Sequence, residues 1–354
     1  MIAALDIQVT KTAKSKIGEI DFNNLPFGKY FTDHMLEVDF ADGEWKTVAI
    51  RPFQNLSLSP ALAAIHYGQS IFEGIKAYKD RDGKPFIFRP FDNFKRFNLT
   101  AERMRMPLVP EEIFMEGMRQ LVALDKDWIP MKNDYSLYIR PFMFSTDDVI
   151  GVRPSLNYKF MILLSPTGPY YSKPMRIYVE EHYTRAAKGG IGFAKAAGNY
   201  GSSMLATAVA IEKGYDQVLW TDAVEHKYVQ EIGTMNVFFI IGNKAVTPDL
   251  GSGTILEGVT RDSAIQVLKE IGLTVEERPI SIDEIISAHK AGELKELFGT
   301  GTAATVSMIE ELRYKDYVMK FDTDTWKAVP AVKSIITDIR EGRREDTRGW
   351  MFKV

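Results

Sequence analysis

The chain has 354 residues, 45% of them hydrophobic and 26% charged, and a formal net charge of −3. This composition is typical of a globular protein and excludes a disordered chain, and the length predicts about two domains, each with its own core. Lysine and arginine are dispersed among acidic residues, which excludes nucleic acid as an expected partner.

The chain lacks cysteine, so disulfides, thiolate zinc sites and a cysteine nucleophile are excluded. This fits a reducing cytoplasm, which is the expected location. The apolar run at residues 1–5 precedes the nearby lysines rather than following them, unlike a signal peptide. The apolar runs at 160–164 and 237–241 are too short to cross a bilayer. We therefore expect a soluble protein without a membrane partner.

The first part of the chain is predicted to be an α+β domain. Strand-like segments lie at residues 75–78, 86–88, 135–144 and 157–164. The turn at residues 80–83 joins the first two into a hairpin. Asp92 is expected to cap a helix that ends before Pro107, and Pro110 to begin a second helix that continues to about Leu124. Because strands and helices follow in separated groups, the sheet is expected to be antiparallel or mixed.

The best candidate for a domain boundary is the segment 165–174 (SPTGPYYSKP), which directly follows a strand-like segment. Its three prolines and one glycine interrupt any regular element. The predicted organisation is a smaller N-terminal α+β domain (1–165), a linker (166–174) and a larger C-terminal domain (175–354).

The second part mixes short strands with helices. Strands are predicted at 175–181, 216–221, 227–232 and 235–241. Ser202 or Ser203 is expected to cap a helix that stops at Gly214, a residue suited to the position after a helix. Further helices are predicted at 261–271, directly after Gly258-Val259-Thr260, and at 281–291.

The most informative stretch is residues 195–201 (KAAGNYG), where one lysine stands among residues too small to cover it. An amine that forms a Schiff base with a carbonyl cofactor needs open space around Nζ, which alanine and glycine provide. Tyr200 adds a phenol that could hydrogen-bond a ring oxygen. Taken alone, a lysine in a Gly/Ala-rich loop is commonly just a solvated residue, so the assignment depends on the rest of the chain.

Two further runs are suited to a phosphate. Residues 258–261 (GVTR) offer backbone N–H groups and a hydroxyl at a helix N-terminus, although a glycine turn with a threonine cap is the commoner meaning. Residues 299–304 (GTGTAA) are predicted to be a second run of the same type. Together with Lys195 they indicate a phosphorylated aldehyde, of which pyridoxal phosphate is the obvious example.

A pyridoxal enzyme also needs an acid near the pyridine nitrogen. Glu231 is a candidate because its apolar neighbours favour partial burial, although a lone strand glutamate is usually solvated. Arg96 would bind the phosphate if its helix faces the cofactor. The spacing of Gly251, Gly253 and Gly258 does not fit a dinucleotide motif, the five histidines lack metal-ligand spacing, and no Gly-x-Ser-x-Gly elbow is present.

A set of motifs, spread over most of the chain from residue 27 to about 309, carries a resemblance to a known family. Each motif alone is weak, but their order and spacing taken together are specific. The motifs are 27–36 (FGKYFTDHML), 66–68 (HYG), 72–76 (FEGIK), 89–96 (RPFDNFKR), 138–141 (YIRP), 164–166 (LSP), 195–201, 217–220 (QVLW), 231–236 (EIGTMN), 258–261 and 298–303 (FGTGTA). The chain resembles the branched-chain amino acid aminotransferases, class IV (fold type IV) pyridoxal phosphate enzymes. The resemblance implies a two-domain α+β fold whose C-terminal domain binds the cofactor around a β-barrel-like core. It also implies reversible amino transfer between L-leucine, L-isoleucine or L-valine and 2-oxoglutarate by a ping-pong mechanism.

The resemblance also implies residue roles. Lys195 would be catalytic, forming the Schiff base and then moving the proton between Cα and C4′. The implied cofactor-binding set is Arg96, Lys195, Tyr200, Glu231, Thr234, Leu256, Val259, Thr260 and Thr302. The implied substrate-binding set is Phe31, Tyr67, Phe72, Tyr138, Arg140, Ile150, Val152, Tyr170, Thr302 and Ala303. Aromatic walls suit an aliphatic side chain and Arg140 the distal carboxylate of glutamate, although any one of these aromatics could be simple core packing.

By the same resemblance, Ile150 and Val152 would reach into the pocket of a partner protomer, so a homodimer is expected. Where some members carry a Cys-x-x-Cys, this chain has Ala304 and Ser307, which excludes a thiol switch there. Two alternatives remain open. One is a D-amino acid transaminase or an aminodeoxychorismate-lyase-like enzyme of the same fold, and the other is a non-catalytic binding protein that kept the scaffold.

Overall fold

A computed structural model describes residues 5–171 and 173–354. The chain divides into two compact units, each considered by itself. The first comprises the chain up to Tyr170, together with Ala194–Gly198 and Asp338–Val354. The second comprises Tyr171–Phe193 and Asn199–Thr337.

The first unit is built on a sheet that has ten strands among the residues that the structure describes. They are β1 (Ile7–Val9), β2 (His34–Ala41), β3 (Glu44–Trp45), β4 (Val48–Pro52), β5 (Ser70–Phe72), β6 (Ile75–Lys79), β7 (Pro85–Phe88), β8 (Ser136–Ser145), β9 (Tyr158–Thr167) and β19 (Met351–Lys353). Their order is β1-β4-β2-β9-β8-β6-β7-β19, with β3 beside β2 and β5 beside β8. The strands predicted in this part are confirmed as β6 to β9, and β6 and β7 form the predicted hairpin.

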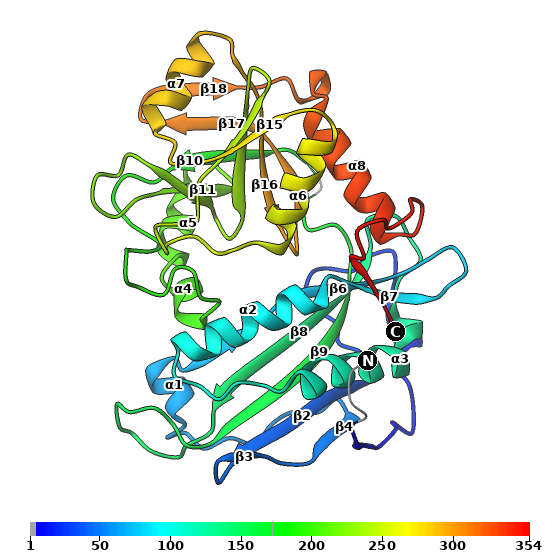
Figure 1. Cartoon of the computed structure of the whole chain (residues 1–354). Coiled ribbons are helices and arrows are strands. Elements are labelled where there is room, and N and C mark those ends of the chain that lie inside the picture. The colour runs from blue at the N-terminus through cyan, green and yellow to red at the C-terminus, as the bar shows by residue number, and fades with distance from the viewer. Residues whose placement is uncertain (1–4, 172) are drawn as a thin grey trace. The chain divides into compact units, whose positions relative to one another are not determined.

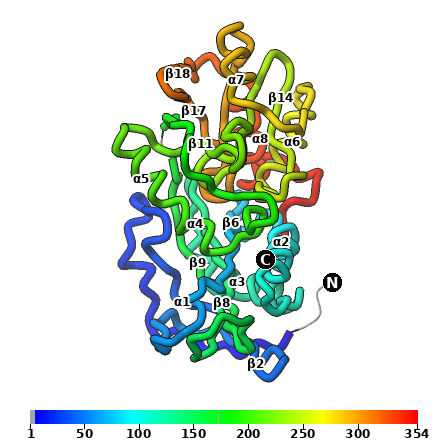
Figure 2. The backbone as a smooth tube through the Cα atoms, turned by 90° about the vertical axis from the view of Figure 1, so that its left-hand side faces the viewer, coloured from blue at the N-terminus to red at the C-terminus, as the bar shows by residue number. Residues whose placement is uncertain are grey.

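Two of the helices of this unit, α2 and α3, cover one face of its sheet. The helical elements are α1 (Ala63–Tyr67), α2 (Pro90–Arg103), α3 (Gly117–Leu124), the 3₁₀ turns η1 (Ile17–Glu19) and η3 (Lys126–Trp128), and the π-helical turn η2 (Glu112–Glu116). Figures 1 and 2 both place α2 and α3 on the same side of β8 and β9. The ring of Phe160 on β9 lies 5.5 Å from that of Phe97 and 5.8 Å from that of Phe114. These buried rings join helices and sheet into one core, where each would cost about 3–5 kcal/mol to truncate to alanine.

The first predicted helix of this unit begins earlier than expected, whereas the second begins at Pro110 as predicted, since Pro110 O accepts from Phe114 N at 3.1 Å. Helix α2 starts at Pro90, and Asp92 does not cap it but accepts a hydrogen bond from Arg89 Nε at 2.8 Å. Proline at the first helical position already has the φ that the helix needs, so the start moves three residues earlier, with Arg89 in place of Asp92 at the N-cap. The second helix passes through η2 and continues as α3. A Cβ on Gly117, at their junction, would lie 2.6 Å from Leu36 Cδ1, so the absence of a side chain lets the helix approach β2.

The second unit is built on a mixed sheet of nine strands within the described part of the chain. They are β10 (Met175–Val179), β11 (Gln217–Thr221), β12 (Val229–Ile232), β13 (Asn236–Ile241), β14 (Lys244–Thr247), β15 (Thr274–Glu277), β16 (Leu294–Gly301), β17 (Thr305–Tyr314) and β18 (Tyr317–Lys320). Their order is β12-β11-β10-β17-β16-β13-β14-β15, with β18 beside β17. Strand β10 runs parallel to β11 and β17, whereas β13 is antiparallel to β14 and β16. The four strands predicted here are confirmed as β10 to β13, and the mixed α+β class is confirmed.

The remaining helical elements are α4 (Ala197–Gly201), α5 (Met204–Glu212), α6 (Val259–Glu270), α7 (Ile282–Lys290), α8 (Ala328–Arg340) and the 3₁₀ turn η4 (Thr323–Thr325). Ser203 precedes α5 without capping it, because its hydroxyl donates to Tyr200 O at 2.8 Å. Helix α6 begins at Val259, two residues before the predicted start. Ser281 is the N-cap of α7, as its Oγ accepts a hydrogen bond from Glu284 N at 3.1 Å.

The units differ from the predicted domains in two segments. Residues 194–198 and 338–354, predicted to lie in the C-terminal domain, belong to the first unit. The reason is backbone pairing: Phe72 N donates to Lys195 O at 3.2 Å, and β19 adds an antiparallel strand beside β7. The chain passes from the first unit to the second after Tyr170, inside the predicted linker.

The cap of α7 gives a stability test. Ser281→Ala removes the acceptor for Glu284 N, and we expect the free energy of unfolding to fall by about 1 kcal/mol in a denaturant titration. Ser287→Ala, at an exposed position inside the same helix, is the control and should not destabilise. Equal losses in both variants would contradict the capping role.

Candidate functional site

In the first unit, Lys195 is fixed through its backbone. Its N–H donates to Thr100 Oγ1 at 3.0 Å, and its carbonyl accepts from Phe72 N at 3.2 Å. The Lys195 Nζ lies 4.8 Å from the centre of the Phe72 ring, at a half-buried position. The chain around this lysine is therefore held by hydrogen bonds that do not involve its amine.

One face of α2 is both polar and buried. Asn93, Arg96 and Thr100 follow at helical spacing and are 2%, 8% and 1% exposed. Arg96 binds Glu73 with two hydrogen bonds, from Nε to Oε1 at 2.7 Å and from Nη2 to Oε2 at 2.9 Å. Such a two-point pair fixes the plane of the guanidinium. The predicted phosphate ligand is thus a buried, oriented side chain.

Glu73 was not among the predicted site residues, although it lies in the motif 72–76. Its side chain is fully buried, and Oε2 also accepts from Asn93 Nδ2 at 2.8 Å and from Gly74 N at 3.0 Å. Burial alone would raise the pKa of this carboxyl, but Arg96, Lys195 and Asn93 together hold the pKa below its ordinary value. The group is therefore ionised at neutral pH. A glutamate between apolar residues and a glycine was the available sequence signal.

Part of the predicted substrate set gathers in the same unit. Arg140 Nη2 donates to Tyr138 Oη at 2.9 Å, two positions away on β8, and its guanidinium carbon lies 4.5 Å from the centre of the Phe72 ring. Phe27, which the prediction did not include, connects two further rings: its centre is 4.8 Å from that of Tyr138 and 5.1 Å from that of Tyr170. These residues place one cation among aromatic rings.

Other predicted substrate residues have different surroundings. Phe31 stacks on Phe53, with ring centres 4.9 Å apart. Tyr67 is exposed at the end of α1, beside His66. Ile150 and Val152 are 68% and 89% exposed in the loop after β8. That two aliphatic side chains lie so open is compatible with a contact to another chain, which stays a prediction.

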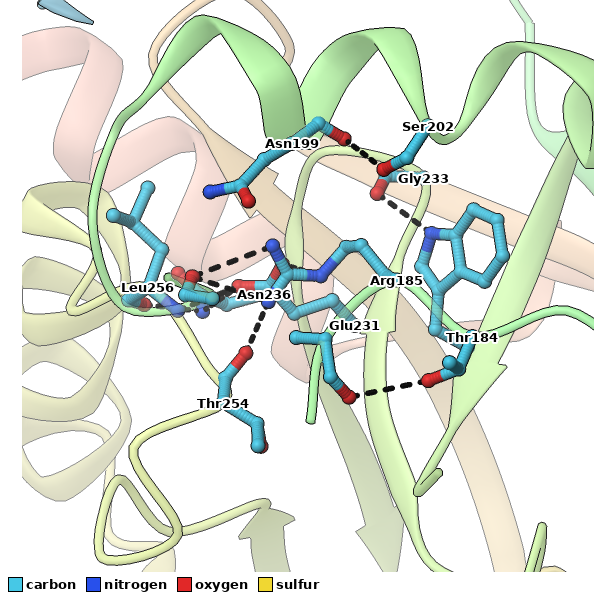
Figure 3. Close-up of polar contacts among 12 residues, drawn as sticks. Thr184, Arg185, Asn199, Ser202, Glu231, Gly233, Asn236, Thr254 and Leu256 are labelled. Atoms are coloured by element: carbon cyan, nitrogen blue, oxygen red, sulfur yellow. Dashed lines mark hydrogen bonds and ion pairs between the residues drawn. The ribbon is translucent and has the colours of Figure 1, made fainter. Parts of the chain in front are cut away.

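In the second unit, Glu231 on β12 is 3% exposed and surrounded by donors (Figure 3). Its Oε1 accepts from Leu256 N at 3.0 Å and from Asn236 Nδ2 at 3.2 Å. Its Oε2 forms an ion pair with Arg185 Nε at 2.9 Å. The partial burial predicted for Glu231 is confirmed, and it comes with a cationic partner that lay outside the prediction.

Arg185 holds together three segments of this unit. Besides Glu231, its guanidinium donates to the carbonyls of Gly192 and Thr254. Figure 3 shows the side chain between the strand of Glu231 and the loop that contains Thr254 and Leu256. No local sequence motif identifies Arg185. Two of its partners, Glu231 and Thr254, are 46 and 69 residues away along the chain, and the third, Gly192, lies in a loop without regular structure.

The predicted anion site at residues 258–261 lies at the N-terminus of α6. Gly258 is the N-cap, and Val259 and Thr260 form the buried first turn. A Cβ on Gly258 would overlap Asn236 Oδ1, so only glycine lets the chain pass Asn236, which also donates to Leu256 O at 2.9 Å. The Glu231 carboxylate and the start of α6 are therefore joined through one asparagine.

The second predicted phosphate run does not stand at a helix N-terminus. Residues 299–301 lie in β16, where Gly299 pairs with Val237 and with Ser307, so that part of the prediction is wrong. Thr302 and Ala303 form the turn between β16 and β17. A Cβ on Gly301 would be 3.9 Å from Thr234 O, so the backbone of Thr234 lies beside the end of this strand.

Gly258 gives a test of this packing. Gly258→Ala is expected to displace Asn236 and to lower the free energy of unfolding by about 1–3 kcal/mol, because the new methyl group overlaps a hydrogen-bonded side chain. The thermal unfolding midpoint is the measurement. Gly18→Ala, where a Cβ would meet nothing within 4 Å, is the matched control. An unshifted midpoint in Gly258→Ala would contradict the close approach.

Within the described residues, none of the helices is long and apolar enough to cross a membrane. The same part of the chain contains no group of three or more histidine, aspartate or glutamate side chains arranged to hold a metal ion.

Comparisons with known proteins agree with this arrangement. Residues 70–312 match the family of class IV aminotransferases. A probable branched-chain-amino-acid aminotransferase of Staphylococcus aureus (strain MRSA252) is 48% identical over 360 residues, covering 100% of this chain and 99% of that protein. The structure of the Escherichia coli branched-chain amino acid aminotransferase has a TM-score of 0.74 at 26% identity, covering 90% of this chain and 99% of that one. Another branched-chain amino acid aminotransferase, solved with N-(5′-phosphopyridoxyl)-L-glutamate and coming from the organism abbreviated T.th., has a TM-score of 0.72 at 28% identity, covering 89% and 98%. The chain therefore belongs to the class IV aminotransferases and, within them, to the branched-chain-amino-acid aminotransferases.

Proposed function

We propose that this protein transfers the amino group reversibly between L-leucine, L-isoleucine or L-valine and 2-oxoglutarate, with pyridoxal phosphate as cofactor. The observation that carries the proposal is Arg140 among aromatic rings, because one pocket must accept both an aliphatic side chain and a carboxylate. The names of the relatives and the phosphopyridoxyl-glutamate in one of the related structures point the same way.

The residues present fit the cofactor. Gly258 lets the chain pass close to Asn236, and the first turn of α6 that follows it offers N–H groups and the helix dipole, which suit a phosphate. The buried Glu231 carboxylate suits a protonated pyridine nitrogen. When bound, pyridoxal phosphate supplies an electron sink for the bonds at the substrate Cα. In the proposed set, Arg96, Val259, Thr260 and Thr302 bind the phosphate, and Tyr200, Leu256 and Thr234 contact the ring or lie beside it.

Lys195 would first hold the cofactor covalently and then carry a proton on Nζ between the substrate Cα and C4′ of the cofactor. Its backbone hydrogen bonds to Thr100 and Phe72 support this double role, because the amine can change partners while the main chain stays in place. Arg185 would help Glu231 to stay ionised, so that Glu231 can attract the positive charge of the pyridine ring.

Substrate recognition divides between apolar and charged contacts. The rings of Phe72, Tyr138 and Tyr170, with Phe31 and Tyr67, would line the space for an aliphatic side chain. Arg140 would bind the distal carboxylate of glutamate or 2-oxoglutarate, with the hydroxyl of Tyr138 orienting its guanidinium. The backbone at Thr302 and Ala303 would receive the α-carboxylate. The proposal includes a cytoplasmic homodimer in which Ile150 and Val152 reach the partner's pocket.

The first test is the visible spectrum of the purified protein after incubation with pyridoxal phosphate. We expect a yellow absorption band that L-leucine, added without a keto acid, converts to that of pyridoxamine phosphate. Lys195→Ala should lose multiple turnovers while keeping its thermal midpoint, because the backbone hydrogen bonds that hold this segment do not involve the side chain that is removed. Lys188→Ala, in the loop before it, is the control.

Three outcomes would change the proposal. Multiple turnovers by Lys195→Ala would move the covalent role to Lys188. A band that responds to D-alanine but not to L-leucine would favour the D-amino acid transaminase. A protein that stays colourless in pyridoxal phosphate would favour the non-catalytic binding protein.

The second test separates the two substrates. Tyr138→Phe removes the hydroxyl that accepts from Arg140, so we expect the KM for 2-oxoglutarate to rise about tenfold and that for L-leucine to change little. Tyr135→Phe, whose exposed hydroxyl bonds to Asn23 O, is the control. Equal effects on both substrates would show that Arg140 does not act on the distal carboxylate.

A further inference from the structure

Arg96 owes its fixed orientation to one carboxylate. Glu73 binds its Nε and Nη2 edge, so the opposite edge, with Nη1 and the second N–H of Nη2, lies away from that partner. Both side chains are more than nine-tenths buried. A rotation of Arg96 would therefore leave its own N–H donors without hydrogen bonds and the buried charge of Glu73 without its ion pair. Glu73 is itself fixed by Asn93 and by Gly74 N.

The same carboxylate is coupled to the lysine segment. Glu73 follows Phe72, whose N–H binds Lys195 O, and Thr100, on the buried face of α2 with Arg96, binds Lys195 N. Within this unit, the charged groups around Phe72 and Glu73 are Arg96, Lys195 and Arg140, all cations. Glu73 is the anion among them, and Lys195 is one of the cations that hold its pKa below the ordinary value.

We propose that Glu73 is a positioning residue of the transamination site, which aims Arg96 at the cofactor phosphate and supplies negative charge beside Lys195. This inference rests on the proposed function. The orienting effect and the charge effect act differently on an anion: loss of the orientation weakens phosphate binding, whereas loss of the negative charge alone would strengthen it. The sign of the change in affinity therefore shows which effect is larger.

The experiment measures binding of pyridoxamine 5′-phosphate to the apoenzyme by calorimetry, because this ligand tests the phosphate contacts without a bond to Lys195. For Glu73→Gln we expect the Kd to rise roughly ten- to a hundredfold, the range for losing hydrogen bonds to a charged group. Pyridoxamine, which lacks the phosphate, should bind the variant and the original protein equally.

A second readout isolates the charge. In Glu73→Gln loaded with pyridoxal phosphate, the midpoint of the pH-dependent change in the visible band should move down by about one unit, because a neighbouring anion is lost. Glu73→Asp keeps the charge but has a side chain one methylene shorter. It should restore the pH midpoint while still binding pyridoxamine 5′-phosphate weakly.

Glu37→Gln is the matched control. Glu37 on β2 forms another partly buried ion pair of this unit, at 2.5 Å from Arg51 Nη2, so its loss should lower stability without changing either readout. If Glu73→Gln does not fold, Asn93→Ala removes one hydrogen bond from Glu73 and should raise the Kd by a few fold.

Two results would overturn the inference. An unchanged Kd and pH midpoint in Glu73→Gln, with only a lower thermal midpoint, would leave Glu73 a structural residue. Tighter binding of pyridoxamine 5′-phosphate would mean that the negative charge of Glu73 outweighs its hydrogen bonds to Arg96, so that Glu73 does not position Arg96 for the phosphate. Failure of the unaltered protein to bind pyridoxamine 5′-phosphate would instead reject the proposed cofactor.

Discussion

A buried carboxylate remains an anion only where cations and N–H groups surround it, and this condition applies to one glutamate in each unit. In the first unit it explains why α2 turns a polar face inward and why Arg96 is not a surface residue. In the second it explains why β12, the loop at 254–256 and the loop before Lys195 converge on Glu231. The apolar cores supply most of the stability, but these two anions determine where the polar side chains lie.

The two anions also have different neighbours. Glu73 is neutralised mainly by the side chain that is the candidate phosphate ligand, whereas Glu231 shares a cation, Arg185, that is absent from the predicted ligand set. In each case a backbone N–H adds a fixed donor, from Gly74 and from Leu256. Rigid donors reduce the freedom of the carboxylates, which matters in a site where charges must keep their positions during proton transfer.

Much of this fold could be predicted from local patterns. The hairpin of β6 and β7 and the Ser281 cap follow from turn and capping residues that act over a few positions. The candidate lysine and Glu231 could be found because small residues or apolar flanks surround them. Arg185 and the pairing of β19 with β7 could not, since their partners are distant along the chain. The run at 299–301 was misassigned because its glycines and threonine resemble those at the start of α6, whereas here the glycines give Met235 room beside β16.

The pairing of β19 with β7 has a consequence for the order in which the protein can be built. Residues 338–354 complete the sheet of the first unit, and residues 194–198 bind β5, so most of the chain must leave the ribosome before that unit has all its contacts. Contacts between segments more than 250 residues apart form late in folding, because the chain must first close a long loop. During synthesis β7 therefore lacks its neighbour β19 until the end of the chain is made. The nascent first unit exposes the edge of β7, which can associate with other chains.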